Sequence, residues 1–300
     1  MRLSLDALAT LDAIARKGSF AAAAEELHRV PSAVTYVVQK LEQDLGLLIF
    51  DRSGHRAKLT PEGTELLREG RHLLRAAGEI EERMQRLARG WENELAITVD
   101  EIIPVERMFP LVEAFYRLNP GTRLRLSEEV LAGTWEALHD GRAELVIGVS
   151  GDAPAEGGCS MLSLGNIRFV FAVAPSHPLA RLTEPLAPGD ILAHRAVLAA
   201  DSARHLPPRT TGLLAGQDRL TVPSVRAKLA AQVAGLGVGY LPTHIADPEI
   251  AAGRLVARAV AEPKPSAELF AAWHNRQMGK ALEWFIAQLG DGVVRAGLLG

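Results

Sequence analysis

Hydrophobic positions in the first part of the chain recur at helical spacing. Leu8, Leu11 and Ala15 lie on one side of a first predicted helix, which Gly18 ends with a left-handed turn. Ser19 is then placed to cap a second helix. The apolar positions of that helix follow the i, i+3, i+4, i+7 rule: Phe20, Ala23, Ala24 and Leu27. The pattern therefore predicts a small helical core.

A third predicted helix has two contrasting faces. It begins at Pro31, where the missing N–H of proline costs nothing. Its apolar stripe consists of Val34, Val38, Leu41 and Leu45. Its other face carries short or flat polar side chains: Ser32, Thr35, Tyr36 and Gln39. With no acid before Glu42, this face suits a major groove lined by phosphates. The alternative is an ordinary solvated face, although such faces usually carry Glu and Lys pairs.

The next segment reads as a strand over residues 47–50, a glycine turn and a return strand ending at Lys58. This hairpin predicts a wing whose cations meet backbone phosphates. Over residues 1–58 the charge is only eight basic minus seven acidic residues, or +1, so the basic patch is local. The residues predicted to contact DNA are Ser32, Ala33, Thr35, Tyr36, Gln39, Lys40, Arg52, Ser53, His55, Arg56 and Lys58.

Several short motifs occur together in one order between residues 18 and 63. They are Gly18-Ser19-Phe20, the alanine run 21–24, Ser32-Ala33-Val34-Thr35, Leu41-Glu42, Leu45-Gly46, Phe50-Asp51-Arg52 and Leu59-Thr60-Pro61-Glu62-Gly63. Together they resemble the DNA-binding segment of the LysR-type transcription regulators. Val30 and Pro31 stand where that family commonly has Ser and Gln, and Tyr36 stands where it has Arg or Lys. An operator preference different from the family average is therefore expected.

Residues 59–90 read as one long helix. Thr60 is placed as the N-cap with Pro61 at the first helical position, and Glu62 favours the positive helix end. Apolar or small residues then alternate at steps of four and three: Leu66, Gly70, Leu73, Ala77, Ile80, Met84 and Leu87. Such a narrow stripe predicts a dimer seam, because a helix lying on its own domain normally buries a wider face. A dimer can read a pseudo-palindromic operator in double-stranded DNA.

From residue 94 onward, strands and helices alternate in a βαβαβ order. Residues 95–99, 122–127 and 145–149 read as strands, and residues 104–118 and 134–140 as helices. Two later stretches, residues 169–180 and residues 233–242, resemble the effector domain of the same family.

The resemblance implies an α+β chain. It comprises a winged helix-turn-helix at residues 1–58, a dimerisation helix at 59–90 and an effector domain at 91–300, a two-lobed α/β fold like that of periplasmic binding proteins.

The resemblance also implies that a small-molecule effector lies between the lobes. The positions matching the family's usual contacts are Asp100, Glu101, Glu129, Val130, Ala200, Asp201, Ser202, Pro223 and Ser224. Relatives that bind carboxylates tend to offer Ser or Thr after the first two strands, where this chain has Asp100-Glu101 and Glu128-Glu129. If two of these acids face the cleft, the effector is a neutral hydroxylated aromatic or a cation. Alternatively, they face solvent or pair with Arg123, Arg125 or Arg168.

Composition excludes several classes of protein. A formal net charge of -3 argues against a protein that coats nucleic acid nonspecifically. No apolar stretch approaches the ~18 residues of a membrane span, and Asp6 and Asp12 interrupt any secretory signal. No membrane partner and a cytoplasmic location are therefore expected. Cys159 is the only cysteine, which rules out an intramolecular disulfide and leaves a cysteine-based zinc site without ligands.

No enzyme motif is complete. Tyr240 stands where a dinucleotide fingerprint starting at Gly235 needs its third glycine, residues 148–151 are one residue short of a nucleophile elbow, and His194 and His205 are too loosely spaced for a metal site. We therefore expect no catalytic residue, metal or cofactor. A solute-binding protein would need a signal peptide, and an α/β enzyme with a helical extension would need a catalytic constellation. The expected partners are DNA, an effector and a second copy, with a tetramer as the family expectation and RNA polymerase as a further candidate.

Overall fold

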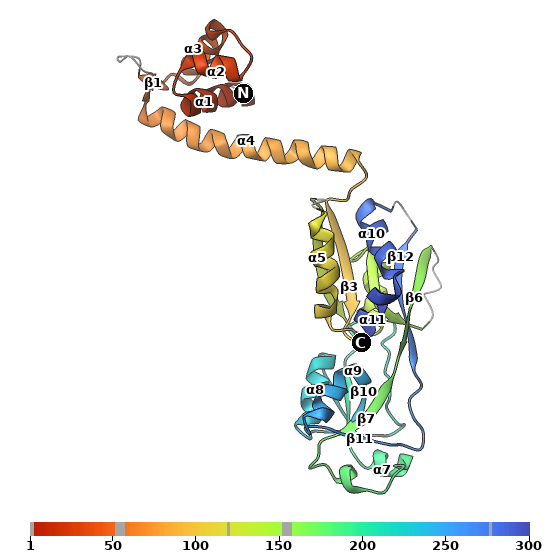
Figure 1. Cartoon of the computed structure of the whole chain (residues 1–300). Coiled ribbons are helices and arrows are strands. Elements are labelled where there is room, and N and C mark those ends of the chain that lie inside the picture. Colours follow the sequence, from red (N-terminus) through yellow and green to blue (C-terminus); the bar gives the residue numbers. More distant parts are fainter. Residues whose placement is uncertain (1–2, 52–57, 119–120, 152–157, 276–277) are drawn as a thin grey trace. The chain divides into compact units, whose positions relative to one another are not determined.

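A computed structural model describes residues 3–51, 58–118, 121–151, 158–275 and 278–300 (Figure 1). The chain divides into two compact units, Met1–Ala88 and Arg89–Gly300. Among the described helices, none combines the length and the apolar character needed to cross a membrane.

The first unit is a helical core with a short hairpin and a long final helix. Its elements are α1 (Leu5–Lys17), α2 (Phe20–Glu26), α3 (Pro31–Leu45), β1 (Phe50–Asp51), β2 (Lys58–Leu59) and α4 (Pro61–Ala88). Ser4 and Ser19 cap α1 and α2, because their hydroxyl oxygens accept from the N–H groups of Ala7 and Ala22 at 3.2 and 3.1 Å. The core contains Leu11, Ile14, Ala23, Val34, Val38, Leu41, Ile49 and Phe50. The predicted helical core is therefore present, but the strand pair differs from the prediction, because β1 begins at Phe50 rather than at residue 47 and β2 begins at Lys58 rather than ending there.

The start of α4 is packed tightly against the rest of the first unit. The Thr60 hydroxyl oxygen accepts from the Gly63 N–H at 2.9 Å, as expected of an N-cap, and its hydrogen is directed to the Leu48 carbonyl at 2.8 Å. A Cβ on Gly63 would approach the Ile49 carbonyl oxygen to 2.2 Å, and one on Gly70 would approach the Leu8 side chain to 2.7 Å. Both glycines permit close approach of the helix.

This packing corrects the predicted dimer seam. Gly70 is buried against Leu8 and is not available to a partner, and Leu66 packs half-buried on the core of its own unit. The later seam positions are different. Leu73, Ile80, Met84 and Leu87 are 44% to 51% exposed. An unsatisfied apolar stripe on α4 therefore begins at Leu73.

The second unit has two lobes, and the first is a sheet covered by helices on both faces. The strand order is β4-β3-β5-β12-β6. The strands are β3 (Glu94–Asp100), β4 (Arg123–Glu129), β5 (Leu145–Ser150), β6 (Cys159–Ile167) and β12 (Ala267–His274). β3 runs parallel to β4 and β5, whereas β12 is antiparallel to β5 and β6. The helices are η1 (Val105–Met108), α5 (Phe109–Arg117), α6 (Ala132–His139), α10 (Lys280–Leu289) and α11 (Gly292–Leu299).

Alternation along the strands assigns each residue to one of the two faces. Leu95, Ile97 and Val99 of β3 belong to the core formed with α5, α10 and α11. Residues of β5 that point the other way, such as Val146, pack with Trp135 of α6. Because Asp100 is out of phase with Leu95, Ile97 and Val99, its side chain lies on the α6 side.

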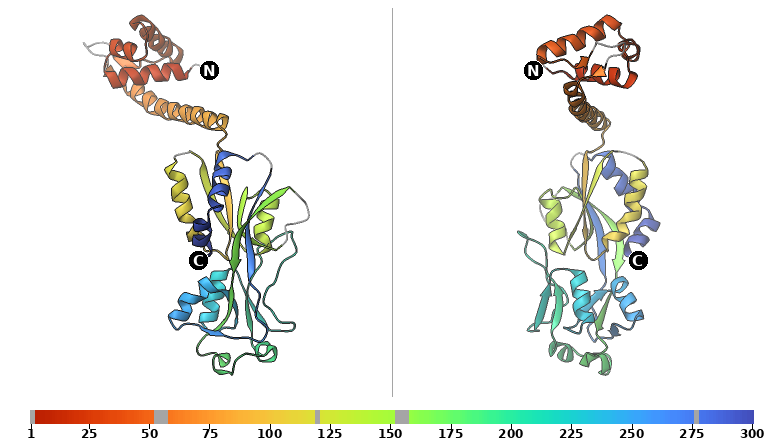
Figure 2. Two further views of the ribbon diagram at one scale, coloured as in Figure 1. Left: turned by 45° about the vertical axis from the view of Figure 1, so that its right-hand side comes forward. Right: turned by 90° about the vertical axis from the view of Figure 1, so that its left-hand side faces the viewer.

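The second lobe combines antiparallel and parallel strand pairs. The sheet β10-β7-β11 is antiparallel, and β8 lies parallel to β9. The elements are β7 (Phe169–Val173), η2 (Pro178–Arg181), α7 (Pro188–Leu192), β8 (Ala196–Ala199), β9 (Arg219–Val222), α8 (Val225–Val233), β10 (Gly239–Pro242), α9 (Thr243–Ala251) and β11 (Val256–Arg258). The chain enters this lobe between β6 and β7 and leaves it before β12, and β6 pairs with β12 beside the crossing (Figure 2).

Candidate functional site

The outward face of α3 is exposed where contact with DNA is predicted. Ser32, Gln39 and Lys40 are exposed, and the Tyr36 side chain is 64% exposed. Ala33 and Thr35 are half-buried, and the Thr35 hydroxyl donates to the Pro31 carbonyl of its own helix at 3.0 Å. The α3 positions predicted from sequence therefore lie together on one face, with Ala33 and Thr35 set back.

The N-terminus of α3 differs from those of α1 and α2. Its N-cap, Val30, provides no side-chain hydrogen bond and is 63% exposed. The positive end of a helix that carries no side-chain cap can accept an anion such as a DNA phosphate. This feature was not recognised from the sequence, although an apolar residue directly before Pro31 was a usable signal.

Ion pairing distinguishes the cations of the first unit. Arg16, Lys17, Arg29 and Arg71 all pair with carboxylates, with Glu26 serving both Arg16 and Lys17. Among the described residues, Lys40 and Lys58 have no carboxylate within salt-bridge distance. Lys40 on α3 and Lys58 on β2, together with Arg75 on α4, are thus described cations of the first unit that remain for an external anion.

The base of the wing is fastened to α3 by a buried carboxylate. In the hairpin Phe50 pairs with Leu59 and Asp51 with Lys58. The Glu42 side chain, 8% exposed, accepts hydrogen bonds from the N–H groups of Ile49 at 2.8 Å and Phe50 at 3.1 Å. The predicted contacts Arg52, Ser53, His55 and Arg56 lie outside the described residues.

A cavity of about 160 Å³ lies between the two lobes of the second unit. It is placed at the carboxyl ends of β3, β5 and β8, as is usual for ligands of open α/β sheets. Its lining is largely apolar: Ile102, Val130, Leu131, Phe169, Leu198, Ala199, Val225, Tyr240, Leu241, Pro242 and Ala267. Its polar lining residues are Asp100, Ser150, Thr211, Lys228 and Lys264. Of the positions predicted for effector contact, Asp100 and Val130 line this cavity.

Asp100 reaches the cavity with its carboxyl group already engaged. Its oxygens accept from the N–H groups of Ile102 and Leu131, both at 3.0 Å, and from the Thr134 hydroxyl at 2.9 Å. Burial raises the pKa of Asp100 to about 7 despite these donors. Asp100 therefore ties together the turns after β3 and β4.

Other predicted effector contacts have structural partners instead. Glu101 accepts from the Val225 N–H at 2.6 Å, and burial raises its pKa. Glu129 forms an ion pair with Arg142, not with the arginines considered from the sequence. The Ser224 hydroxyl caps α8 by accepting from the Ala227 N–H at 3.0 Å. The Ala200 N–H donates to Val222 at 2.8 Å and Pro223 is exposed, so neither lines the cavity.

Asp201 and Ser202 also differ from their predicted role, because they bind the first lobe. The Asp201 carboxylate accepts from the N–H groups of Ala132 and Gly133, at the start of α6, both at 3.2 Å. The Ser202 hydroxyl oxygen accepts from the Val130 N–H at 2.8 Å. A Cβ on Gly133 would lie 2.0 Å from this hydroxyl, so glycine permits the approach. This contact clasps the two lobes together.

Glu136 completes the clasp from the other side. Its side chain is 1% exposed and accepts from the backbone N–H groups of Arg204, His205 and Leu206 at 2.7 to 3.0 Å. Burial by itself raises its pKa, but these donors outweigh burial and bring the pKa of Glu136 to about 2. It is therefore a charged, fully engaged acceptor at neutral pH.

Lys228 and Lys264 were missed as site residues by sequence reasoning. The Lys264 ammonium lies 3.3 Å from the Thr211 hydroxyl oxygen and 3.7 Å from the centroid of the Phe169 ring. Burial lowers the pKa of both lysines to about 8, and repulsion by Lys264 contributes at Lys228. Among the described residues, neither ammonium has a carboxylate within salt-bridge distance.

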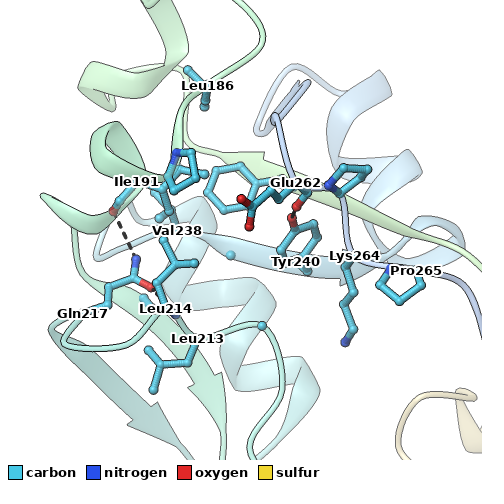
Figure 3. Close-up of a pocket in the computed structure, with 16 residues that line it drawn as sticks. Leu186, Ile191, Leu213, Leu214, Gln217, Val238, Tyr240, Glu262, Lys264 and Pro265 are labelled. Carbon is cyan, nitrogen blue, oxygen red and sulfur yellow. Dashed lines mark hydrogen bonds between the residues drawn. The ribbon is translucent and has the colours of Figure 1, made fainter.

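A second cavity of about 300 Å³ lies within the second lobe and shares Tyr240 and Lys264 with the first (Figure 3). The Tyr240 hydroxyl donates to the Glu262 carbonyl at 2.9 Å, while Figure 3 shows the Lys264 side chain extending away from this contact. Gln217, buried beside the cavity, donates to the carbonyls of Ile191 and His194 at 3.1 and 2.9 Å. The Tyr240 hydroxyl and the Gln217 amide of this cavity are thus used within the protein.

In the part of the chain that the structure describes, no cluster of His, Cys, Asp or Glu is arranged to hold a metal ion.

The sequence matches the family model described as a bacterial regulatory helix-turn-helix protein, lysR family, over residues 5–64. It also matches the LysR substrate binding domain over residues 88–293. The chain belongs to the LysR family of transcriptional regulators. It is therefore a ligand-responsive DNA-binding regulator and not an enzyme, and members of this family form oligomers.

Individual relatives agree with this assignment. The chain is 40% identical to the uncharacterized HTH-type transcriptional regulator YeeY of Escherichia coli over 285 residues, covering 95% of this chain and 92% of YeeY. It is 41% identical to the probable HTH-type transcriptional regulator YhaJ of Escherichia coli, covering 96% of both. A solved OxyR C206 mutant from Corynebacterium glutamicum has a TM-score of 0.63 at 18% identity, covering 99% of this chain and 94% of OxyR, which supports the fold alone.

Replacing Glu42 tests the attachment of the wing. Glu42→Ala leaves the buried N–H groups of Ile49 and Phe50 without this acceptor. The free energy of unfolding of the first unit is expected to fall by about 2 kcal/mol. Chemical denaturation measures this change, and Glu25→Ala, at an exposed position, is the matched control. Equal losses in the two variants would contradict the role assigned to Glu42.

Replacing Glu136 tests the clasp through its pH dependence. Because the pKa of Glu136 in the folded chain is about 2, against 4.5 for an ordinary Glu, its contribution to stability is complete above pH 4.5 and is lost as pH falls towards 2. Glu136→Gln should lower the Tm at neutral pH, and its Tm should fall less steeply than that of the wild type below pH 4.5. The exposed Glu283→Gln is the control, and parallel Tm profiles for all three proteins would refute the assignment.

Proposed function

We propose that this LysR-family regulator reads its operator with the exposed face of α3 and anchors itself through Lys40, Lys58 and the wing. The observation that carries the proposal is that the N-terminus of α3 has no side-chain cap, while Lys40, farther along α3, and Lys58, on β2, have no carboxylate within salt-bridge distance among the described residues. The predicted division into a DNA-binding segment at residues 1–58, a linker helix at 59–90 and an effector domain at 91–300 is retained as part of this proposal.

Each side chain of α3 suits a particular contact. The Gln39 amide can bond adenine through both its donor and its acceptor, and the Tyr36 ring can pack on a thymine methyl group. Ser32 and Thr35 offer hydroxyls to base edges or phosphates, and Ala33 allows close approach. The predicted wing contacts Arg52, Ser53, His55 and Arg56 supplement this surface through backbone phosphates.

A second copy of the chain supplies the other half of the DNA-binding site. The exposed apolar stripe on α4, formed by Leu73, Ile80, Met84 and Leu87, is the proposed dimer seam. Pairing would place two α3 helices on successive major-groove faces of a pseudo-palindromic operator. A tetramer and contact with RNA polymerase stay predictions from family resemblance.

The effector is proposed to bind in the cavity between the lobes, where it touches both. Asp100 and Val130 belong to the first lobe, while Leu198, Lys228 and Tyr240 belong to the second. A ligand that contacts both lobes changes the free energy of their relative arrangement. We propose that this change alters subunit packing, and with it the spacing or bend of the bound operator.

The prediction of a neutral hydroxylated aromatic or cationic effector is not retained. It required free carboxylates in the cleft. Asp100 is held by backbone and hydroxyl donors, Glu101 binds the N–H of Val225, and Glu129 pairs with Arg142. Glu128 is exposed and does not line this cavity, so an anionic effector is not opposed by free carboxylates there.

DNA binding through α3 is tested by gel shift of the full chain with its own upstream intergenic DNA. Lys40→Ala should weaken binding by about tenfold and reduce the dependence on salt by the equivalent of one phosphate contact. Tyr36→Ala should reduce discrimination between operator and competitor DNA. Lys17→Ala, at a cation already paired with Glu26, is the control. If Lys40→Ala and Tyr36→Ala shift the operator like the control, α3 is not the reading surface.

The dimer seam is tested by a matched pair of substitutions on α4. Ile80→Lys places a charge in the proposed seam and should weaken dimerisation by roughly 100-fold. Glu79→Lys introduces the same residue beside the seam and should leave the dimer intact. Light scattering after size-exclusion chromatography gives the mass of each species. Dimers of equal stability for both variants would rule out the seam.

A further inference from the structure

We propose that the effector of this regulator is a small organic anion whose charged group binds Lys228 and Lys264 and whose apolar body fills the cavity between the lobes. This inference rests on the proposed function, because it assigns a chemical class to the ligand of the same cavity. In this proposal, ammonium groups from the second lobe bind the anion. They take the place of the hydroxyl donors that carboxylate-binding relatives tend to use.

The charged residues that line the cavity favour an anionic ligand. Lys228 comes from α8, and Lys264 comes from the segment that returns to the first lobe before β12. Among the described lining residues, the one acid is Asp100, whose oxygens already accept hydrogen bonds. Burial also leaves the Asp100 carboxyl partly neutral, since its pKa is about 7. The free charge presented to a ligand is therefore positive.

Burying the two lysines without a described carboxylate costs free energy, and this also favours an anionic ligand. Two half-buried lysines lie here without a described carboxylate, and burial lowers the pKa of each to about 8. Only six of the 33 basic residues in the sequence are lysines, and two of the six line this cavity. Lysine is a compact point charge, and the described ion pairs of the second unit use arginine or histidine instead. An incoming anion would offset the cost.

The walls of the cavity limit the anion to one with an apolar body. Ile102, Leu131, Leu198 and Tyr240 surround the space between the lobes, and an inorganic ion would leave these surfaces against water. The cavity, about 160 Å³, is smaller than the ~300 to 1,000 Å³ typical of sites for drug-sized ligands. A single ring or a short branched chain with one carboxylate fits both constraints. The hydroxyls of Ser150 and Thr211 are available for further hydrogen bonds.

The test measures thermal shift and calorimetric binding on the full chain with a matched set of probes. Benzoate, benzamide and benzylammonium share one ring and differ in charge, while 2-methylbutyrate, acetate and inorganic phosphate vary the body of the anion. We expect stabilisation by benzoate or 2-methylbutyrate and little from the neutral or cationic probes, from acetate or from phosphate. Affinity should fall as pH rises through about 8, where the lysines lose their charge.

Variants connect this binding to the named lysines. Lys228→Met and Lys264→Met keep most of the side-chain volume and should each weaken binding of the organic anion by about tenfold or more. Lys228→Arg should retain more affinity than Lys228→Met. Lys280→Met, at an exposed lysine outside the cavity, should bind like the wild type. Without ligand, Lys228→Met should have a higher Tm, because a buried cation is removed, which also shows that the variant folds.

Several outcomes would overturn the inference. These are equal binding of benzamide and benzoate, equal stabilisation by phosphate and the organic acids, unchanged affinity in both methionine variants, or no stabilisation by any anion of the set at millimolar concentration. Gel shifts on the operator distinguish failure of the effector class from failure of the proposed DNA-binding function. If operator binding persists while the anions fail, the effector class is wrong and the DNA-binding function stands. If operator binding fails as well, the proposed function is wrong.

Discussion

Carboxylates that accept hydrogen bonds from backbone N–H groups fasten the functional parts of both units. Glu42 joins α3 to the first strand of the wing, and Asp201 and Glu136 clasp the lobes from opposite directions. Asp100 joins the turns beside the cavity. A carboxylate suits this task because it is an acceptor with several lone pairs, and bonds to a charged acceptor are stronger than neutral ones. Removing one leaves buried N–H groups unsatisfied, which costs more than the bond itself contributes.

The same constraint determines the electrostatics of each surface. Acids engaged by backbone donors or by arginine present less free negative charge than the net charge of -3 suggests. On the first unit, Lys40 and Lys58 have no carboxylate within salt-bridge distance among the described residues, and the α3 terminus has no side-chain cap. In the second unit, the same holds for Lys228 and Lys264, which line the cavity between the lobes. Local pairing, rather than total charge, therefore decides which anions the protein can attract.

The clasp also bears on how a ligand acts. Asp201 and Glu136 hold the loop after β8 to α6, which makes one junction between the lobes. Glu101 makes a second junction at the start of α8, the helix that carries Lys228. A ligand bound to Lys228 would therefore act on the helix at which this second junction is made.

The sequence by itself determined the local elements: the helical core, the outward face of α3, the Thr60 cap and the order of motifs that identifies the family. These follow from periodicity and capping within a few turns of chain. Tertiary structure decided the rest. It placed Gly70 against Leu8 rather than in the seam, and it used Asp201 and Ser202 to hold the first lobe. It also brought Lys228 and Lys264 to one cavity. Glu136 meets the N–H of Arg204 across 68 positions, and no local pattern encodes such a contact, because packing of distant elements determines which groups meet.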